Sequence, residues 1–239
     1  MTSQEDHIHP LKQKIADLLH AQQYQQALEI LSDISPEDHR DDWFLHHRGM
    51  LHSYLENYSA AVADFTAAIA INPHNALNFT FRALAYLWLE DHAAAILDET
   101  QAILIDDELG EAYFGRGNVY YELKDFERAI LDYNRAILLD PTHEIALNHR
   151  SCAYFHLGNY EQAMSDAEAA LTLNPDYADA IVSLAECHSA TGNAELFYEL
   201  MEKALTIDPT ELDLLSPQTL ARHQNEPQFL ALKEKYAAQ

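Results

Sequence analysis

Apolar and small residues recur along this sequence at a fixed interval. An apolar residue, a polar residue and a proline end four stretches, at 71–73, 139–141, 173–175 and 207–209, and the last three prolines are 34 residues apart. Such a period marks stacked copies of one supersecondary unit. We therefore divide the chain into windows of 34 residues: 8–41, 42–75, 76–109, 110–143, 144–177 and 178–211.

The pattern inside each window predicts two antiparallel helices joined by a turn near the sixteenth place. A small residue holds the eighth place, and alanine recurs at the twentieth and twenty-seventh. Helices that approach closely need small residues where they touch, so these places predict the contacts within and between hairpins. The residues are Gly49, Ala83, Gly117, Ser151 and Ala185, then Ala27, Ala61, Ala95, Ala129 and Ala163, then Ala68, Ala102, Ala136, Ala170 and Ala204.

The segment from Ala112 to Pro141, AYFGRGNVYYELKDFERAILDYNRAILLDP, resembles a tetratricopeptide (TPR) repeat over its full length. The resemblance extends over residues 8–211. It implies an all-α fold, a right-handed α-α superhelix of about six helical hairpins. It says little about function, because this repeat serves many unrelated binding tasks.

The C-terminal part of the chain departs from the repeat pattern. The sixth window has Phe197 where alanine is expected, as suits a terminal repeat that covers an open hydrophobic face. Ser216 and Pro217 form a helix-start signal. We expect residues 1–7 to be a mobile tail, 8–211 the repeat solenoid, and 212–239 a C-terminal helical cap.

Charged residues follow the same period. Arginine holds the seventh place and aspartate the twenty-third in four consecutive windows, and both change to leucine in the sixth, at Leu184 and Leu200. These two places lie at similar heights on facing helices, so each arginine can pair bidentately with its aspartate. The alternative is independent surface charges. The predicted pairs are Arg48–Asp64, Arg82–Asp98, Arg116–Asp132 and Arg150–Asp166.

The family resemblance implies that the first helices line a concave groove. The second, fifth, ninth, twelfth and thirteenth places share one helical face. They are mostly apolar or aromatic from the second to the fifth window and become polar at Asp179 and Glu186. The alternative is that they pack against neighbouring first helices. The candidate peptide-binding residues are Trp43, His46, Met50, Tyr54, Leu77, Leu84, Trp88, Phe114, Asn118, Tyr121, Asn148 and Phe155.

The net charge and the absence of known catalytic motifs limit the classes of function that the chain can have. The chain has 14 basic and 39 acidic residues, a formal net charge of −25, which argues against nucleic acid and anionic membranes as partners. No metalloprotease, serine-hydrolase or phosphate-loop motif is present. We therefore expect neither enzyme activity, nor a cofactor, nor a metal site. Without a signal peptide or an apolar run long enough to span a bilayer, the sequence predicts a cytoplasmic location.

Two functions fit this description. The first is a protein-binding scaffold, or adaptor, that holds an apolar peptide segment with flanking Lys or Arg in its groove. The alternative is a structural subunit that self-assembles through the groove or the C-terminal cap, and it would make the chain a homo-oligomer.

Overall fold

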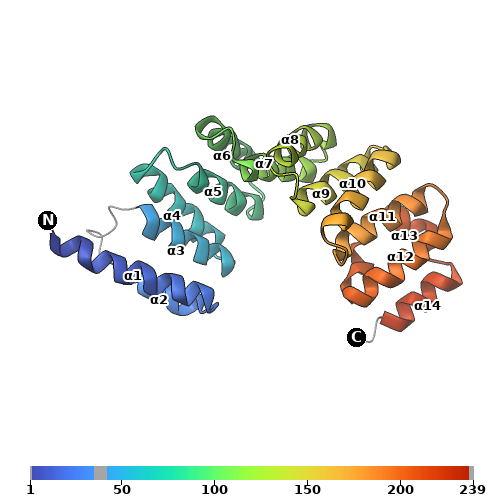
Figure 1. Ribbon diagram of the computed structural model, residues 1–239, viewed down its shortest axis with the longest axis horizontal. Coiled ribbons are helices and arrows are strands. Elements are labelled where there is room, and N and C mark those ends of the chain that lie inside the picture. Colours follow the sequence, from blue (N-terminus) through green and yellow to red (C-terminus); the bar gives the residue numbers. More distant parts are fainter. Residues whose placement is uncertain (1, 35–41, 237–239) are drawn as a thin grey trace. The chain divides into compact units, whose positions relative to one another are not determined.

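The computed structural model describes residues 2–34 and 42–236, and the regular secondary structure of these residues is helical (Figure 1). The chain forms two compact units, Met1–Val119 and Tyr120–Gln239, here called unit 1 and unit 2. Each unit is described by itself.

Unit 1 consists of successive helical hairpins. The helices are α1 (Thr2–His20), α2 (Tyr24–Ser32), α3 (Asp42–Tyr54), α4 (Tyr58–Ile71), α5 (Ala76–Trp88), α6 (His92–Ile105) and most of α7 (Gly110–Glu122). The helices α3 and α4 pack together, as do α5 and α6, and α4 also contacts α5. Each hairpin therefore lies against the next.

Unit 2 continues the same arrangement and ends in a different one. Its helices are α8 (Phe126–Leu139), α9 (Glu144–His156), α10 (Tyr160–Leu173), α11 (Ala178–Ala190), α12 (Ala194–Ile207), the 3-10 helix η1 (Pro209–Leu214), α13 (Pro217–His223) and α14 (Pro227–Tyr236). The helix α12 contacts η1 and α14, and α11 contacts α13. These last three helices take the place expected for the cap.

The helices keep the 34-residue register. From α3 to α12, every first helix fills places 1–13 of its window and every second helix fills places 17–30. At the N-terminus α1 begins at Thr2, so it includes part of the stretch 1–7 for which a mobile tail is predicted, and the mobility stays a prediction. Pro10 lies inside α1, where it lacks the N–H that would complete one backbone hydrogen bond of the helix. Residues 35–41 of the first window and 237–239 of the cap lie outside the described residues.

The small residues lie where helices meet. Every alanine at the twentieth and twenty-seventh places is fully buried. A Cβ atom on Gly49 would come within 2.9 Å of the Phe65 ring, and Ser151 Oγ donates to the Ala163 carbonyl at 2.7 Å. The eighth place thus contacts the second helix of its own hairpin, which explains why Gly, Ala or Ser occupies it from the second window to the sixth.

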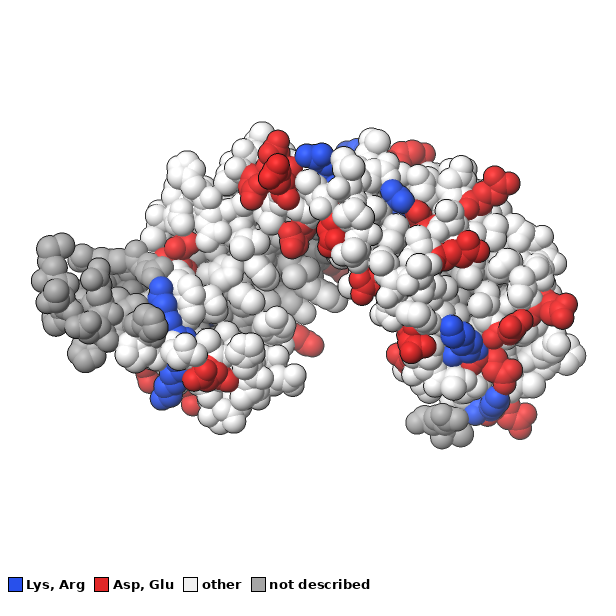
Figure 2. All heavy atoms as spheres, in the orientation of Figure 1, with Lys and Arg blue, Asp and Glu red and all other residues white. Residues whose placement is uncertain are grey.

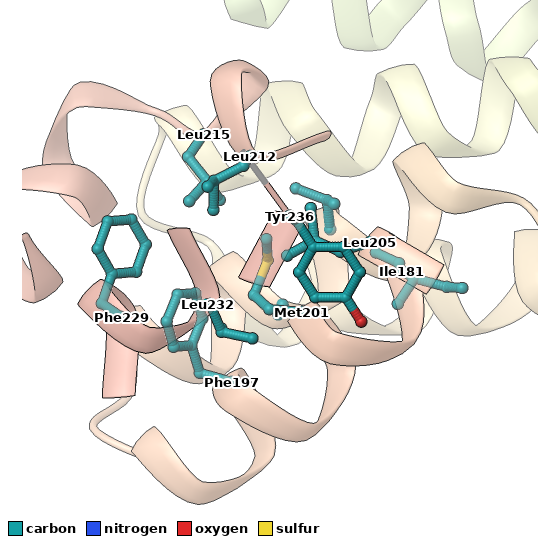
Figure 3. Close-up of a cluster of buried hydrophobic side chains, with 12 residues drawn as sticks. Ile181, Phe197, Met201, Leu205, Leu212, Leu215, Phe229, Leu232 and Tyr236 are labelled. Carbon is teal, nitrogen blue, oxygen red and sulfur yellow. The ribbon is translucent and has the colours of Figure 1, made fainter. Parts of the chain in front are cut away.

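The C-terminal cap closes the last hairpin with a hydrophobic cluster. Phe197, Met201 and Leu205 of α12 lie beside Phe229 and Leu232 of α14 (Figure 3). The ring of Phe197 also stacks on His223 at 4.1 Å between centroids. The large side chain at this place therefore packs against α13 and α14.

Three of the four predicted arginine–aspartate pairs are present as bidentate contacts. Arg48, Arg82 and Arg150 each donate through Nε and Nη2 to both carboxylate oxygens of Asp64, Asp98 and Asp166, at 2.6–2.8 Å. The three aspartates are buried. The fourth pair, Arg116 and Asp132, divides between the two units and stays a prediction.

The arginines also contact the preceding hairpin, which the sequence analysis did not anticipate. Arg82 and Arg116 donate through Nη1 to Thr66 and Thr100, at 2.9 and 3.1 Å. Arg150 donates in the same way to Asn134 at 2.7 Å. These acceptors all hold the twenty-fifth place of the preceding window. Each of these arginines therefore contacts the second helix of the preceding hairpin.

Candidate functional site

Unit 1 exposes apolar side chains along one face of α5. Leu77, Leu84 and Trp88 are all exposed, and their spacing places them on one side of the helix. Trp88 is 62% exposed although its ring stacks on Tyr58 at 5.7 Å between centroids. Tyr54, at the same place of α3, is exposed and stacks on Tyr24. These four candidate residues are available to a partner.

Other candidates on the same predicted face pack between neighbouring first helices. His46 Nδ1 donates to Asn78 Oδ1 on α5 at 2.6 Å. Phe155 is buried in a cluster with Cys187 of α11. The fifth and twelfth places thus face the next first helix, and exposure is concentrated at the second and thirteenth, with Leu84 exposed at the ninth. The five-place face was too wide, because side chains at its edge fill the space between helices.

The remaining candidates of unit 1 are partly covered. Met50 is half-buried against the cluster around Phe65. Trp43 packs on the hydrophobic cluster of α1–α3, and its ring stacks on His47 at 3.8 Å. Phe114 and Asn118 on α7 are half-buried. Of the aromatic candidates, Trp43, Tyr54, Trp88 and Phe114 belong to unit 1, and Tyr121 and Phe155 belong to unit 2.

Unit 2 contains a pocket of about 390 Å³ between α9, α11 and the cap. Tyr121, Asn148 and Phe155 line it, so it includes three of the predicted candidates. We call it the acidic pocket. Its full lining is Tyr121, Asn148, His149, Cys152, Phe155, His156, Asp179, Val182, Ser183, Glu186, Glu211, Leu215, Ser216 and Pro217.

The cap supplies one wall of the acidic pocket. Leu215 belongs to the hydrophobic cluster of the cap (Figure 3) and also lines the pocket. Glu186 of α11 accepts a hydrogen bond at 2.7 Å from the backbone N–H of Ser216, which leads into α13. The sequence does not predict this wall, because the repeat period carries no information beyond its last window. The sequence pattern also ends the candidate surface at Asp179 and Glu186, which line the pocket.

Three carboxyl groups face the acidic pocket. Glu211 is only 3% exposed, and its carboxyl group is hydrogen-bonded to that of Asp179. Burial, this hydrogen bond and the nearby negative charges raise the pKa of Glu211. The third carboxyl group is that of Glu186.

The two histidines of the pocket lining are held neutral. Burial lowers the pKa of His149 to about 4, and burial also lowers the pKa of His156. The hydroxyl of Tyr121 is hydrogen-bonded to His156 Nε2 at 3.1 Å, and burial raises the pKa of Tyr121. The Cys152 thiol has a pKa raised by burial to about 11, so it is not an activated nucleophile. The pocket is therefore suited to binding and carries no activated nucleophile.

Exposed leucines form a feature that the sequence analysis did not single out. On α6, Leu97 is 70% and Leu104 is 74% exposed, and Leu131 and Leu138 hold the same places of α8 and are also exposed. The other windows have Ala, Ser, Thr, Glu or Pro at these places. A comparison of repeats place by place, extended to the second helices, would have found them.

The described residues contain no helix that is both long and apolar enough to cross a membrane. Within the same residues, no group of three or more His, Cys, Asp or Glu side chains could hold a metal ion. Acidic residues outnumber basic ones on the face shown in Figure 2, as the composition requires.

Hairpins of constant register, with an exposed face on their first helices, define a helical-repeat protein. Models of the tetratricopeptide repeat match residues 44–75, 110–143 and 154–215. The chain belongs to the tetratricopeptide repeat family.

Solved structures agree with this fold. The C-terminal part of a TPR repeat-containing protein from Cytophaga hutchinsonii has a TM-score of 0.67 at 16% identity, over 95% of this chain and 94% of that chain. YrrB, a TPR protein with an unusual peptide-binding site, has a TM-score of 0.59 at 19% identity, over 88% of this chain and 97% of that chain. A thermophilic TPR protein in Thermus thermophilus has a TM-score of 0.62 at 20% identity, over 82% of this chain and 97% of that chain. No curated protein matches the sequence.

Proposed function

We propose that this chain is a non-catalytic scaffold that binds a peptide segment of a partner protein along the exposed face of its first helices. The observation that carries the proposal is the row of exposed apolar side chains on α5, namely Leu77, Leu84 and Trp88. Exposed apolar residues that share one face mark interaction sites more often than scattered ones do. YrrB, which has the same fold, is described as having a peptide-binding site.

The charge of the chain specifies the partner further. With a formal net charge of −25, the surface attracts segments that carry Lys or Arg and repels acidic ones. Aromatic and leucine side chains on α5 suit apolar residues of the ligand. We therefore propose a ligand with apolar side chains and flanking basic residues.

The two tryptophans provide a matched test. Peptides are selected from a phage-displayed random library on the whole chain, and their affinities are measured for the wild type, Trp88→Ala and Trp43→Ala. We expect Trp88→Ala to cost about 2 kcal/mol or more of binding free energy, as for a central aromatic anchor, and to leave the Tm nearly unchanged. Trp43→Ala should lower the Tm, because Trp43 packs on the cluster of α1–α3.

Tryptophan fluorescence tests whether Trp88 is exposed in the free protein. In a Trp43→Phe variant only Trp88 emits, and its emission should lie close to that of tryptophan in water. The proposal fails if no peptide is enriched over a blank surface, or if the enriched peptides bind Trp88→Ala as tightly as the wild type.

Self-assembly is the second candidate. Leu97 and Leu104 on α6 support it, because they are more exposed than any residue of the α5 face. They lie on a second helix, so this surface differs from the groove and cap that the sequence favoured.

A further inference from the structure

The acidic pocket of unit 2 has negative charge and no counter-charge. Asp179, Glu186 and Glu211 line it, and its lining contains neither lysine nor arginine. The low pKa values of His149 and His156 leave both rings neutral at pH 7. Buried or half-buried carboxyl groups are normally paired with a cation or with hydrogen-bond donors. In this pocket the buried Glu211 has the carboxyl group of Asp179 as its hydrogen-bond partner, and that partner is itself acidic.

A second and independent feature of the pocket is an acceptor without a donor. Asn148 is only 4% exposed, and its Oδ1 accepts no hydrogen bond from the described residues. An unsatisfied buried acceptor costs about 1–3 kcal/mol, so it is a place where a donor from a ligand is favoured. Asn148 lines the same pocket as the three carboxyl groups.

The remaining walls suit an alkyl chain. Phe155, Val182, Leu215 and Pro217 are apolar, and the Tyr121 ring lies among them in the lining. Long basic side chains bury their methylene groups against such surfaces and keep the charged head near polar partners. A volume of about 390 Å³ falls within the range of small-ligand sites, and it has room for a long side chain.

We propose that the acidic pocket binds the cationic side chain of a lysine or arginine in a partner peptide, with Asp179, Glu211 and Asn148 accepting hydrogen bonds from its charged head. The peptide origin of the ligand rests on the proposed function, whereas the preference for a cation rests on the pocket alone. Arginine and lysine share the chemistry that the pocket recognises, and the two are distinguished experimentally.

Entry of a cation also affects the protonation of Glu211. A positive charge beside Glu211 favours its ionised form and releases the proton, so binding should tighten as pH rises through the pKa of Glu211. The groups that face Glu211 are Asp179 on α11 and Asp208 before η1, and both are acidic. Glu186, His149 and His156 complete the titratable groups around the charged end of the pocket, together with Cys152 and Tyr121.

The test follows the side-chain amide signal of Asn148 in nitrogen-15 correlation spectra of the whole chain. Three probes are titrated separately: the N-acetyl methylamides of arginine, lysine and norleucine. We expect Asn148 and Val182 to shift with arginine or lysine and to stay unchanged with norleucine, which has the alkyl chain without the charge. The tighter of the two cationic probes identifies the preferred residue.

Variants separate the pocket from the general charge of the chain. Asp179→Asn should weaken binding of the cationic probe about ten-fold, which corresponds to about 1.4 kcal/mol. Asp176→Asn removes the same charge from an exposed site outside the lining and should have little effect. Because Asp179 is exposed, its replacement should leave the fold intact, and Glu211→Gln provides a second variant of similar shape.

The proposal is overturned if norleucine shifts Asn148 as strongly as the cations do, if no probe shifts it, or if Asp176→Asn weakens binding as much as Asp179→Asn. None of these results depends on whether the chain binds peptides along α5. Conversely, the selected peptides could bind the chain and yet lack basic residues. That result would support the peptide-binding function and would contradict a peptide cation as the ligand of this pocket.

Discussion

At the scale of single residues, the arginines at the seventh place contribute most to the contacts between charged side chains. Arg82 binds both carboxylate oxygens of Asp98 within its hairpin and also donates to Thr66 of the preceding one. Arg150 repeats the arrangement with Asp166 and Asn134. In the last hairpin, Leu184 and Leu200 hold the two places of the ion pair. This indicates that the hairpin accepts either an ion pair or two leucines there, provided that both residues change together.

We predict that Asp98→Ala destabilises the chain more than the double change Arg82→Leu/Asp98→Leu. The single change leaves a largely covered guanidinium without its carboxylate, at a cost of about 3 kcal/mol, whereas two leucines remove both charges at once. Thermal and urea unfolding of both variants measure the difference. Glu199→Ala, on the exposed face of α12, serves as the control and should change stability by less than about 0.5 kcal/mol. A double variant clearly less stable than Asp98→Ala would contradict the prediction.

At the scale of the helical hairpin, the turn requires a left-handed backbone conformation at one place. The fifteenth place of all six windows has a positive φ: Gln22, Glu56, Glu90, Lys124, Gly158 and Gly192. This left-handed backbone lets a short connection reverse the chain between two helices. Glycine adopts it without strain, whereas the other four residues hold it at some cost in backbone energy.

We predict that Gly158→Ala lowers stability by about 1 kcal/mol, the usual cost of placing a side chain on a left-handed backbone. No atom lies within 4 Å of the position of the new Cβ, so the loss comes from φ alone and not from a clash. Glu90→Ala is the matched control, since it places alanine at the same turn position where a side chain is already present. Equal losses in the two variants, measured by urea unfolding, would show that φ is not the cause.

At the scale of the whole molecule, two features act against each other. The formal net charge of −25 repels one copy of the chain from another. Leu97 and Leu104, with Leu131 and Leu138, expose apolar surface that favours association. Which effect is larger decides between the two candidate functions.

We predict that the charge is the larger effect and that the protein scatters light as a monomer of 27.2 kDa at low and moderate concentrations. Adding salt screens the repulsion over about 10 Å at 0.1 M, so the measurement is repeated across salt concentrations. A mass that rises with concentration, and that returns to the monomer value in Leu97→Ser/Leu104→Ser, would contradict the monomer and favour self-assembly.

The sequence alone determined the all-α hairpin fold and its register. Gly49 and the alanines of the later windows repeat at one interval, and helices that must touch at those places can be arranged in few other ways. Three ion pairs also followed from the sequence, because a fixed separation along two antiparallel helices fixes which side chains face each other. These features are local to one hairpin or repeat from one hairpin to the next, and a periodic pattern records them.

Only the tertiary structure decided which residues of the predicted face stay exposed. Trp88 and Phe155 both lay on that face, yet the first is exposed and the second is buried against α11. The acidic pocket depends on Glu211 and Leu215, which follow the last full hairpin. Burial and pocket formation depend on how side chains from different helices fill the space between them, and no period along a single chain contains that information.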